Sequence, residues 1–345
     1  MAVAVTTVRN SPAPDATPRV KSALVTGGAG FIGSHTVERF LERGWDVTIV
    51  DNLVTGKREN IPAAASFHEI DIRDRAASEL IALLKPDVLV HLAAQMDVRK
   101  SVAEPLFDAE TNIVGSLNLL EAIRHHSPRT RVVFSSTGGA IYGDFTTPPN
   151  EERFEKNPES PYAVAKLAVE HYLAYYGRVH GIESAVLRFG NVYGPRQDPH
   201  GEAGVVAIFC GRILDGKALT VFGDGLQTRD YVYVSDVVEA TWLAAQAHLP
   251  ERGLLDARAF NVGTGVATNV LRLASVLADA AGSRTPIEHA AERRGEQRTS
   301  YLDIAKTTSE LGWRPDVSLE DGLARSYEWF ARRRALDEST APIAI

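Results

Sequence analysis

A tyrosine and a lysine four residues apart, Tyr162 and Lys166, have the types and spacing to do chemistry. They stand at the start of a segment with helical periodicity that we expect to run to about His180, so both side chains share one helix face. A phenol is a poor base because its pKa is about 10, but a neighbouring ammonium group favours the phenolate. The pair predicts that Tyr162 acts as a base on a substrate hydroxyl. The alternative is an amphipathic helix with a half-buried tyrosine and an exposed lysine.

Three hydroxyl residues, Ser135, Ser136 and Thr137, end an apolar run and are followed by Gly138 and Gly139. Hydroxyls at a strand end can bind a sugar oxygen, and glycines allow a ligand to approach the backbone closely. Thr137 is the residue that we expect to shuttle a proton or to anchor the substrate. Ser135 and Ser136, taken individually, are also consistent with polar capping of the strand end.

A short apolar strand at 23–25 runs into a glycine-rich turn and then into a helical pattern. Gly27 lets the chain turn tightly, Gly30 lets the backbone approach a pyrophosphate, and Gly33 lets the helix pack close to the strand. The helix N-terminus offers free N–H groups and partial positive charge to the phosphates. This spacing of glycines predicts a dinucleotide cradle. The turn also contains Phe31 and Ile32.

A second strand at 46–50 ends in Asp51, eighteen residues after Gly33. An acidic side chain at that place can bind both ribose hydroxyls and repels a 2′-phosphate, so we expect the cofactor NAD rather than NADP. The cradle favours the catalytic interpretation of Tyr162 and Lys166. Lys166 can then bind the nicotinamide ribose, and the positive nicotinamide ring also favours the phenolate.

From residue 20 onward, apolar strands alternate with amphipathic helical patterns, which is typical of a parallel sheet covered on both faces. We predict an α/β fold, a Rossmann-type doubly wound parallel sheet with a smaller C-terminal substrate-binding lobe. Further strands are expected at 66–70, 88–92, 131–135, 183–188 and 259–263, and helices at 235–247, 270–281 and 321–335. Because ligands bind at the carboxyl ends of such strands, one crevice should be lined by Asp51, Asp71, Leu92, Ala93, Ala94, Ser135 to Thr137 and Asn191.

The chain divides into three parts in this interpretation. We expect a disordered tail at 1–19, an NAD-binding Rossmann domain at 20–190 to which 230–265 returns, and a substrate-binding lobe at 191–229 and 266–336. The tail lacks the apolar segment of a signal peptide. No apolar run approaches the roughly 18 residues of a membrane span.

The formal net charge of −7 argues against nucleic acid or an anionic membrane as the main partner, because either would favour a basic surface. Cys210 is the single cysteine of the chain, so an intrachain disulfide is impossible and a reducing cytoplasm is expected. We predict no metal site. His68, Glu69 and Asp71 lack the spacing of zinc ligands, and the two histidines at 125–126 suit the dipole of a helix C-terminus.

These residues together resemble the extended short-chain dehydrogenase/reductase family, specifically its nucleotide-sugar epimerase branch, of which UDP-glucose 4-epimerases are typical. The resemblance covers residues 20–335. The matching segments are 27–33, 51–52, 71–72, 91–94, Asn112, 135–137, Tyr162 with Lys166, 188–191, 222–230 and 293–296. The resemblance implies NAD, a UDP-sugar substrate and a homodimer formed through the helices around 112–125 and 162–180.

The resemblance also implies roles for individual residues. Asp71 and Ile72 would contact adenine, Leu92, Ala93 and Ala94 would pass beside the cofactor, and Asn112 would support the region of Lys166. Asn52, Ser135 and Phe189 complete the implied cofactor site. The nucleotide diphosphate-sugar would be held by Asn191, Thr220, Phe222, Arg229, Tyr231, Arg293 and Glu296. The two arginines of this set can bind diphosphate oxygens bidentately.

The reaction class follows from residues near Thr137. Related nucleotide-sugar 4,6-dehydratases carry an Asp-Glu pair where this chain has Gly138 and Gly139, and related decarboxylases usually have Ser-Glu where this chain has Ala140 before Ile141. The resemblance therefore implies epimerisation at C4 of a UDP-hexose, interconverting UDP-glucose and UDP-galactose through a 4-keto intermediate. UDP-glucuronate 4-epimerisation is disfavoured, because Asp198 stands where a basic residue would accept the sugar carboxylate. An NAD-sensing binding protein is disfavoured, because the Tyr/Lys pair is intact.

Ser300 is implied to lie beside the C2 substituent of the sugar. Family members with a bulky tyrosine there exclude N-acetylated sugars, whereas a small residue admits them, so activity on UDP-N-acetylglucosamine stays an alternative. The simpler interpretation is that Ser300 begins a strand over 300–302 and that pocket width is set elsewhere.

Overall fold

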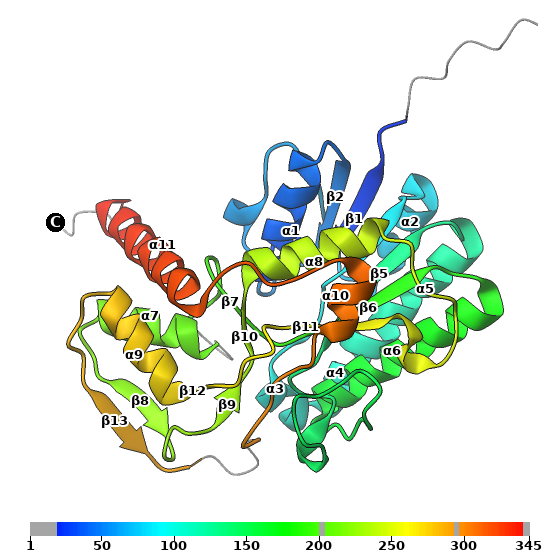
Figure 1. Ribbon diagram of the computed structural model, residues 1–345. Coiled ribbons are helices and arrows are strands. Elements are labelled where there is room, and N and C mark those ends of the chain that lie inside the picture. Colours follow the sequence, from blue (N-terminus) through cyan, green and yellow to red (C-terminus); the bar gives the residue numbers. More distant parts are fainter. Residues whose placement is uncertain (1–18, 200–203, 293–296, 341–345) are drawn as a thin grey trace, which may run out of the picture.

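The computed structural model describes residues 19–199, 204–292 and 297–340. Its centre is a seven-stranded sheet with the order β11-β6-β5-β4-β1-β2-β3, in which every neighbouring pair is parallel (Figure 1). The strands are β1 (Ser22–Thr26), β2 (Asp46–Asp51), β3 (Ser66–Glu69), β4 (Val88–His91), β5 (Arg131–Thr137), β6 (Ser184–Phe189) and β11 (Ala259–Val262). The predicted α/β fold is confirmed, and each predicted sheet strand overlaps one of these.

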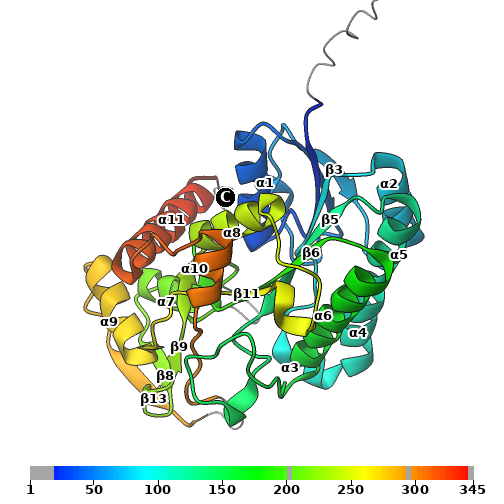
Figure 2. The same cartoon turned by 45° about the vertical axis from the view of Figure 1, so that its right-hand side comes forward.

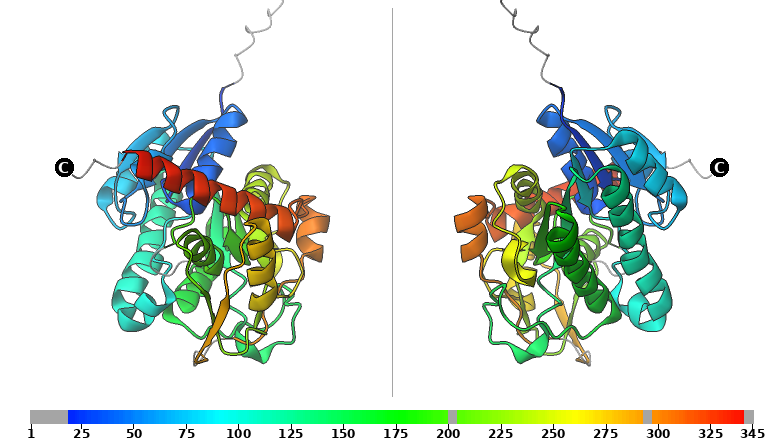
Figure 3. Two further views of the ribbon diagram at one scale, coloured as in Figure 1. Left: turned by 90° about the vertical axis from the view of Figure 1, so that its left-hand side faces the viewer. Right: turned by 90° about the vertical axis from the view of Figure 1, so that its right-hand side faces the viewer.

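Helices cover both faces of this sheet (Figures 2 and 3). On one face lie α1 (Phe31–Glu42) and α8 (Val234–Gln246), whose core includes Phe40, Trp45 and Trp242 in edge-to-face contact. The other face is covered by α2 (Arg75–Leu84), α5 (Gly115–His126) and α6 (Pro161–His180). The two apolar cores exclude water from the sheet on both sides and leave its strand ends open to a ligand.

Helix α6 has strong start and stop signals. The hydroxyl of Ser160 accepts a hydrogen bond from Ala163 N, and Pro161 occupies the first helical position. The helix ends at Gly181, which has a left-handed φ of +74° that favours glycine. These ends fix which residues face the sheet, and they direct Lys166 and Glu170 inward while Val164 and Val179 stay exposed.

A third apolar core belongs to a smaller lobe, whose helices and strands lie beside the sheet in Figure 1. Its helices are α7 (Val205–Leu214), α9 (Val270–Ala280) and α11 (Leu319–Thr340). Three short strand pairs complete it: β7 (Asn191–Tyr193) with β10 (Tyr231–Tyr233), β8 (Leu219–Phe222) with β13 (Ile287–Ala290), and β9 (Thr228–Arg229) with β12 (Thr268–Asn269). The predicted smaller C-terminal lobe is therefore present. Helix α10 (Ala305–Leu311), by contrast, packs on α8 and β11.

The connection from β4 to α5 crosses toward α6. It contains α3 (Val98–Ala103), α4 (Pro105–Ala109) and one wide π-type turn, η2 (Glu110–Val114), all of which contact α6. Single 3₁₀ turns are η1 (Arg58–Asn60), η3 (Gly143–Phe145) and η4 (Leu255–Arg258). No helix in the described ranges has the length and apolar character needed to cross a membrane.

The strand over 300–302 that the simpler interpretation of Ser300 assumed is not formed. Leu302 makes one isolated bridge with Asn150, and Thr299 makes another with Thr228, so this segment passes between two parts of the molecule without joining a ladder. The cause is that the backbone N–H groups of this segment bond to different partners, so no two neighbouring residues pair with the same strand. Ser300 N donates to Thr228 O at 3.1 Å, while Leu302 N donates to the carboxylate of Asp230 at 3.2 Å.

Candidate active site

The glycine turn after β1 has no room for side chains. Gly27 has a φ of +73°, and a Cβ there would lie 2.8 Å from Ala93 N. A Cβ on Gly33 would lie 2.0 Å from Gly27 O, so strand end and helix start could not approach as they do. Gly30 is the N-cap of α1, and within the described residues no side chain caps this helix. The N–H groups of its first turn are thus left for a ligand, which fits the pyrophosphate of NAD.

Asp51 lies at the end of β2, beside this turn. Its carboxylate accepts hydrogen bonds from Ala29 N at 3.0 Å and Leu53 N at 2.8 Å. Burial raises the pKa of this carboxyl above its ordinary value, and the two backbone donors oppose that rise. The carboxylate is therefore anchored to the glycine turn itself, at the place expected for a ribose of the dinucleotide.

We expect Asp51→Ala to weaken NAD binding by about tenfold or more and NADP binding by less, because a charged acceptor for ribose hydroxyls is lost and a 2′-phosphate gains space. Titration calorimetry with both cofactors measures this. Asp46→Ala, at the exposed start of the same strand, is the matched control and should leave both affinities unchanged. Equal weakening of both cofactors, or a wild-type preference for NADP, would contradict the assignment of Asp51.

Two further predicted cofactor residues, Asn52 and Asp71, lie just after the ends of β2 and β3. Asn52 Nδ2 donates to Asp71 at 2.8 Å, and Arg73 binds the same carboxylate in a bidentate manner at 2.8 and 2.9 Å. This arginine is the main reason why the pKa of Asp71 falls to about 2. Ile72 is buried under α5, where it lies against Gly115. The structure thus brings Asn52 and Asp71 together, and it adds Arg73, which sequence reasoning missed.

A second missed group joins the glycine turn to the strand beside it. The hydroxyl of Thr26 bonds His91 Nδ1 at 2.7 Å and accepts from Ala93 N at 3.3 Å. His91 Nε2 bonds the hydroxyl of Ser116 at 2.9 Å. Burial, with a smaller effect of Lys166, lowers the pKa of His91 to about 3, so its ring stays neutral. Through these bonds the position of the 92–94 segment is tied to β1 and to α5.

Lys166 is buried, which excludes the exposed lysine of the amphipathic-helix alternative. Its side chain is 4% exposed, and Nζ donates to Ser135 O at 2.9 Å. The ammonium lies 5.8 Å from the ring centroid of Tyr162 and 4.8 Å from that of Phe134. Burial lowers the pKa of Lys166 to about 8. The predicted pair is therefore together on one face of α6, at the carboxyl end of β5.

The three hydroxyl residues at the end of β5 differ in their partners. Ser135 Oγ donates to His91 O at 3.1 Å, and Ser136 Oγ donates to Glu170 on α6. Among the described residues, the hydroxyl of Thr137 has no hydrogen-bond partner and is half-buried at the strand end. Of the three, Thr137 is the one whose hydroxyl is available to a ligand.

The predicted substrate residues come from three strand pairs of the lobe. Asn191 on β7 and Tyr231 on β10 are direct partners in register. Arg229 Nη1 donates to Thr228 O and Gln297 O, each at 2.8 Å. The same carbonyl oxygen of Thr228 also accepts from Ser300 N. Thr220 and Phe222 lie on β8, and Phe222 lines a shallow pocket with Gly223, Gln227, Glu292 and Arg298. Arg293 and Glu296 lie outside the described residues.

Comparison with known proteins decides the family. The family model for the NAD dependent epimerase/dehydratase family matches residues 23–263. The chain belongs to this family. A UDP-glucose 4-epimerase of Mycolicibacterium smegmatis is 44% identical over 315 residues, which cover 90% of this chain and 98% of that protein. The resemblance inferred from the sequence and the cofactor NAD are thereby confirmed.

Solved structures of epimerases also match. A UDP-glucose 4-epimerase of Thermotoga maritima, crystallised with UDP-glucose, superposes with a TM-score of 0.86 at 46% identity, covering 91% of this chain and 99% of that one. A Thermus thermophilus UDP-glucose 4-epimerase in complex with NAD gives a TM-score of 0.83 at 44% identity, covering 90% and 99%.

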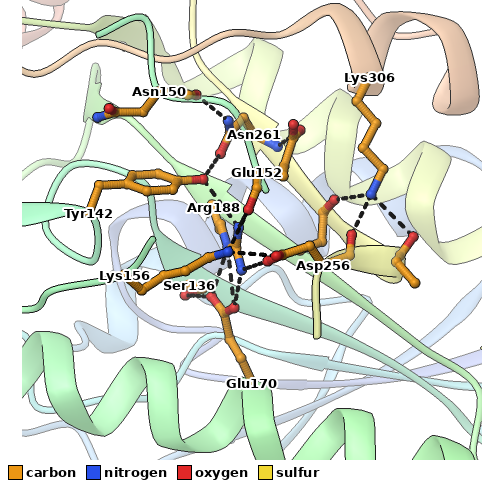
Figure 4. Close-up of polar contacts among 12 residues, drawn as sticks. Ser136, Tyr142, Asn150, Glu152, Lys156, Glu170, Arg188, Asp256, Asn261 and Lys306 are labelled. Atoms are coloured by element: carbon orange, nitrogen blue, oxygen red, sulfur yellow. Dashed lines mark hydrogen bonds and ion pairs between the residues drawn. The ribbon is translucent and has the colours of Figure 1, made fainter. Parts of the chain in front are cut away.

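Behind the Tyr/Lys pair of this epimerase/dehydratase lies a buried cluster of charges, which Figure 4 shows around Arg188. Arg188, on β6, is fully buried and contacts Glu170 with Nε and Nη2, the shortest distance being 2.6 Å. Its Nη2 also reaches Asp256 at 2.7 Å, and its Nη1 donates to Tyr142 OH and Glu152 O. Asp256 in turn accepts from Lys156 at 2.6 Å. The cluster ties β6, α6 and η4 together directly below the residues of the site.

The sequence assigns Arg188 no role beyond its place in the matching segment 188–191. The signal that could have found the cluster is a charged residue inside a strand whose neighbours are all apolar, since a buried arginine requires buried acceptors. No group of three or more His, Cys, Asp or Glu side chains that could hold a metal ion occurs in the parts of the chain that the structure describes.

Proposed function

We propose that this chain is an NAD-dependent UDP-glucose 4-epimerase, which interconverts UDP-glucose and UDP-galactose by inverting C4. The observation that carries the proposal is the buried Lys166 beside Tyr162, at a strand end that also presents Thr137 and adjoins the glycine cradle. The names of the similar proteins, several of which are UDP-glucose 4-epimerases, support the same substrate.

In this reaction Tyr162 takes the proton from O4 of the sugar, and the charge of Lys166 favours the phenolate that does so. Thr137 binds the same oxygen through its unpartnered hydroxyl. NAD, when bound, supplies the site that accepts hydride from C4 and returns it. The lobe residues Arg229 and Tyr231 keep hold of the nucleotide while the keto sugar turns over and presents its other face.

The surroundings of Gly138 favour epimerisation over loss of water. A Cβ at Gly138 would lie 2.7 Å from the side chain of Leu302 and 3.0 Å from Arg188 O. An acidic side chain of the kind that the dehydratases carry at this position cannot be placed here without moving the backbone of β6 or the core around Leu302. The chain therefore has an acid–base group for O4 and has glycines where the dehydratases carry the second pair that elimination requires, the first of them in a place that is crowded for a side chain.

Mass spectrometry of the purified protein, followed by incubation with UDP-galactose, tests the proposal. We expect retained NAD, conversion to UDP-glucose, and no net accumulation of NADH, because the hydride taken from C4 is returned to it. Net NADH formation would make the protein a dehydrogenase, and an NAD-loaded protein that leaves UDP-galactose unchanged would exclude the proposed reaction.

Ser300 gives a further expectation about the sugar. This small residue is only 4% exposed, so a phenol ring introduced there has to displace neighbouring side chains or a bound ligand. We expect detectable activity of the wild type on UDP-N-acetylglucosamine. Ser300→Tyr should lower that activity at least about tenfold more than the activity on UDP-galactose, while Ser300→Ala, the control, should change neither. Equal losses on both substrates, or no N-acetyl activity in the wild type, would show that pocket width is set elsewhere.

One face of helix α6 is apolar and exposed. Helix α6 lies beside α4 and α5 (Figure 2). It carries an exposed apolar stripe, Val164, Tyr172, Tyr175 and Val179, which a second copy of the chain would cover. We infer a homodimer formed through these helices, which sedimentation equilibrium measures directly. A monomer at micromolar concentration would contradict it.

We also propose that the protein is cytoplasmic, since its single cysteine, Cys210, is a free thiol, as is usual for proteins of a reducing compartment.

A further inference from the structure

The buried ammonium of Lys166 requires a negative charge nearby, since a charge transferred from water into a protein interior is costly unless it is compensated. Its hydrogen bond to Ser135 O supplies a dipole and no charge. Four titratable groups act on its charge, from α6 itself and from neighbouring elements such as α4, which packs on α6, and in the described part of the chain none of them is in ion-pair contact with it. They are Tyr162 and Glu170 on α6 itself, His91 on β4 and Asp108 on α4.

Glu170 is already matched by other cations. Its carboxylate receives Arg188 through Nε at 3.2 Å and Nη2 at 2.6 Å, and it also accepts from Ser136. Arg188 shares its charge with Asp256, which is bound in turn by Lys156 (Figure 4). Glu170 is thus bound by a cation at ion-pair distance, and its charge acts on Lys166 less than that of Asp108 does. His91 is neutral and contributes no negative charge.

Asp108 is different, because its partners are neutral. It is 1% exposed, and its Oδ1 accepts from Gln95 Nε2 at 3.0 Å and from Asn112 Nδ2 at 2.9 Å. Its Oδ2 is buried and has no hydrogen-bond partner among the described residues. The π-type turn η2, which follows α4, directs Asn112 inward, where its amide also binds both backbone groups of Gln95 at 2.8 Å. A carboxylate is therefore held rigidly within the site without any cation bound to it.

We infer that Asp108 is the countercharge of Lys166 and acts as a positioning residue that keeps this ammonium charged beside Tyr162. The inference rests on the proposed function for its catalytic meaning, but the charge pairing itself exists without substrate. The burial that lowers the pKa of Lys166 to about 8 is opposed first by Asp108 and then by Glu170. Burial also raises the pKa of Asp108 above its ordinary value, and Gln95, Lys166 and Asn112 oppose that rise. No residue of the Tyr/Lys motif supplies this charge.

Asp108→Asn tests the inference, because asparagine keeps an acceptor for Gln95 and Asn112 while it removes the charge. Lysine labelled with ¹³C at Cε allows the titration of Lys166 to be followed by NMR, with assignment from Lys166→Met. In protein saturated with NAD, we expect the variant to titrate about one pH unit lower than the wild type. Asp236→Asn, a buried carboxyl on α8 that accepts from Val317 N, is the matched control and should leave Lys166 unchanged.

An unchanged or raised pKa of Lys166 in Asp108→Asn would overturn the inference, and so would an Asp108 that is protonated near neutral pH in the wild type. A double-mutant cycle in urea unfolding provides a second readout if the single variant is unstable. Asp108→Asn should destabilise the protein less in the Lys166→Met background than in the wild type, whereas additive effects would contradict the pairing. Neither measurement uses substrate, so failure of the pairing is separate from failure of the proposed epimerase reaction.

Discussion

Tyr162→Phe should lower the turnover of UDP-galactose by about 10²-fold or more, because a positioned base contributes at least that much to proton transfer. The phenyl ring keeps the contacts of the phenol with its surroundings, and Lys166 stays bound to Ser135 O, so the fold and the bound NAD should be retained. Initial rates measured with saturating UDP-galactose give the effect on kcat directly.

Tyr327→Phe, at another half-buried tyrosine on α11, is the control and should keep the wild-type rate. Turnover of Tyr162→Phe within a few-fold of wild type would remove Tyr162 from the chemistry. Loss of NAD together with activity would instead show that the tyrosine acts mainly in cofactor binding, so cofactor content has to be measured on the same sample.

Arg188→Met should lower the free energy of unfolding by about 3–5 kcal/mol, since it leaves the Glu170 carboxylate buried without its cation. Arg188 and Glu170 are both fully buried, with Nη2 and Oε2 separated by 2.6 Å, so no water replaces the lost partner. Urea unfolding followed by circular dichroism measures the change. Arg178→Met on the exposed side of α6, where the guanidinium makes one hydrogen bond to Gly253 O, should change stability by less than about 1 kcal/mol.

The double variant Arg188→Met with Glu170→Gln separates charge from packing. If the loss comes from an uncompensated carboxylate, removing that charge should recover part of the stability, because Asp256 keeps its contact with Lys156. A double variant that is less stable than Arg188→Met alone would mean that Arg188 acts through packing and neutral hydrogen bonds.

The fold and the cofactor cradle were predictable because their signals are local. A strand, a glycine turn and a helix succeed one another within 22–42, and the steric need for Gly27 and Gly33 arises between segments that follow each other closely. The pairing of Tyr162 with Lys166 was predictable for the same reason, since helical spacing alone places both on one face.

The support of the site was not predictable, because it depends on contacts between distant segments. Thr26, His91 and Ser116 meet only after β1, β4 and α5 have assembled, and their side chains carry no mark in the sequence that relates one to another. Asp108 belongs to a helix of five residues whose π-type continuation no periodicity indicates. The error at 300–302 has a similar origin, since its bridges to Asn150 and Thr228 are set by the two segments between which it runs.

The return of β11 to the edge of the sheet, beside β6, has a consequence for how this architecture can change. Part of the smaller lobe, including α7, β8 and β9, lies in the excursion that the chain makes between these two paired strands. The entropy of closing a loop rises only by about 0.6 kcal/mol for each doubling of its length. Insertions and deletions in the turns between β6 and α8 therefore leave the stability of the sheet almost unaffected, provided that they avoid the core of α7 and α9. A pocket for a larger or differently charged sugar can be built by lengthening these turns, while the cradle and the catalytic helix keep their places.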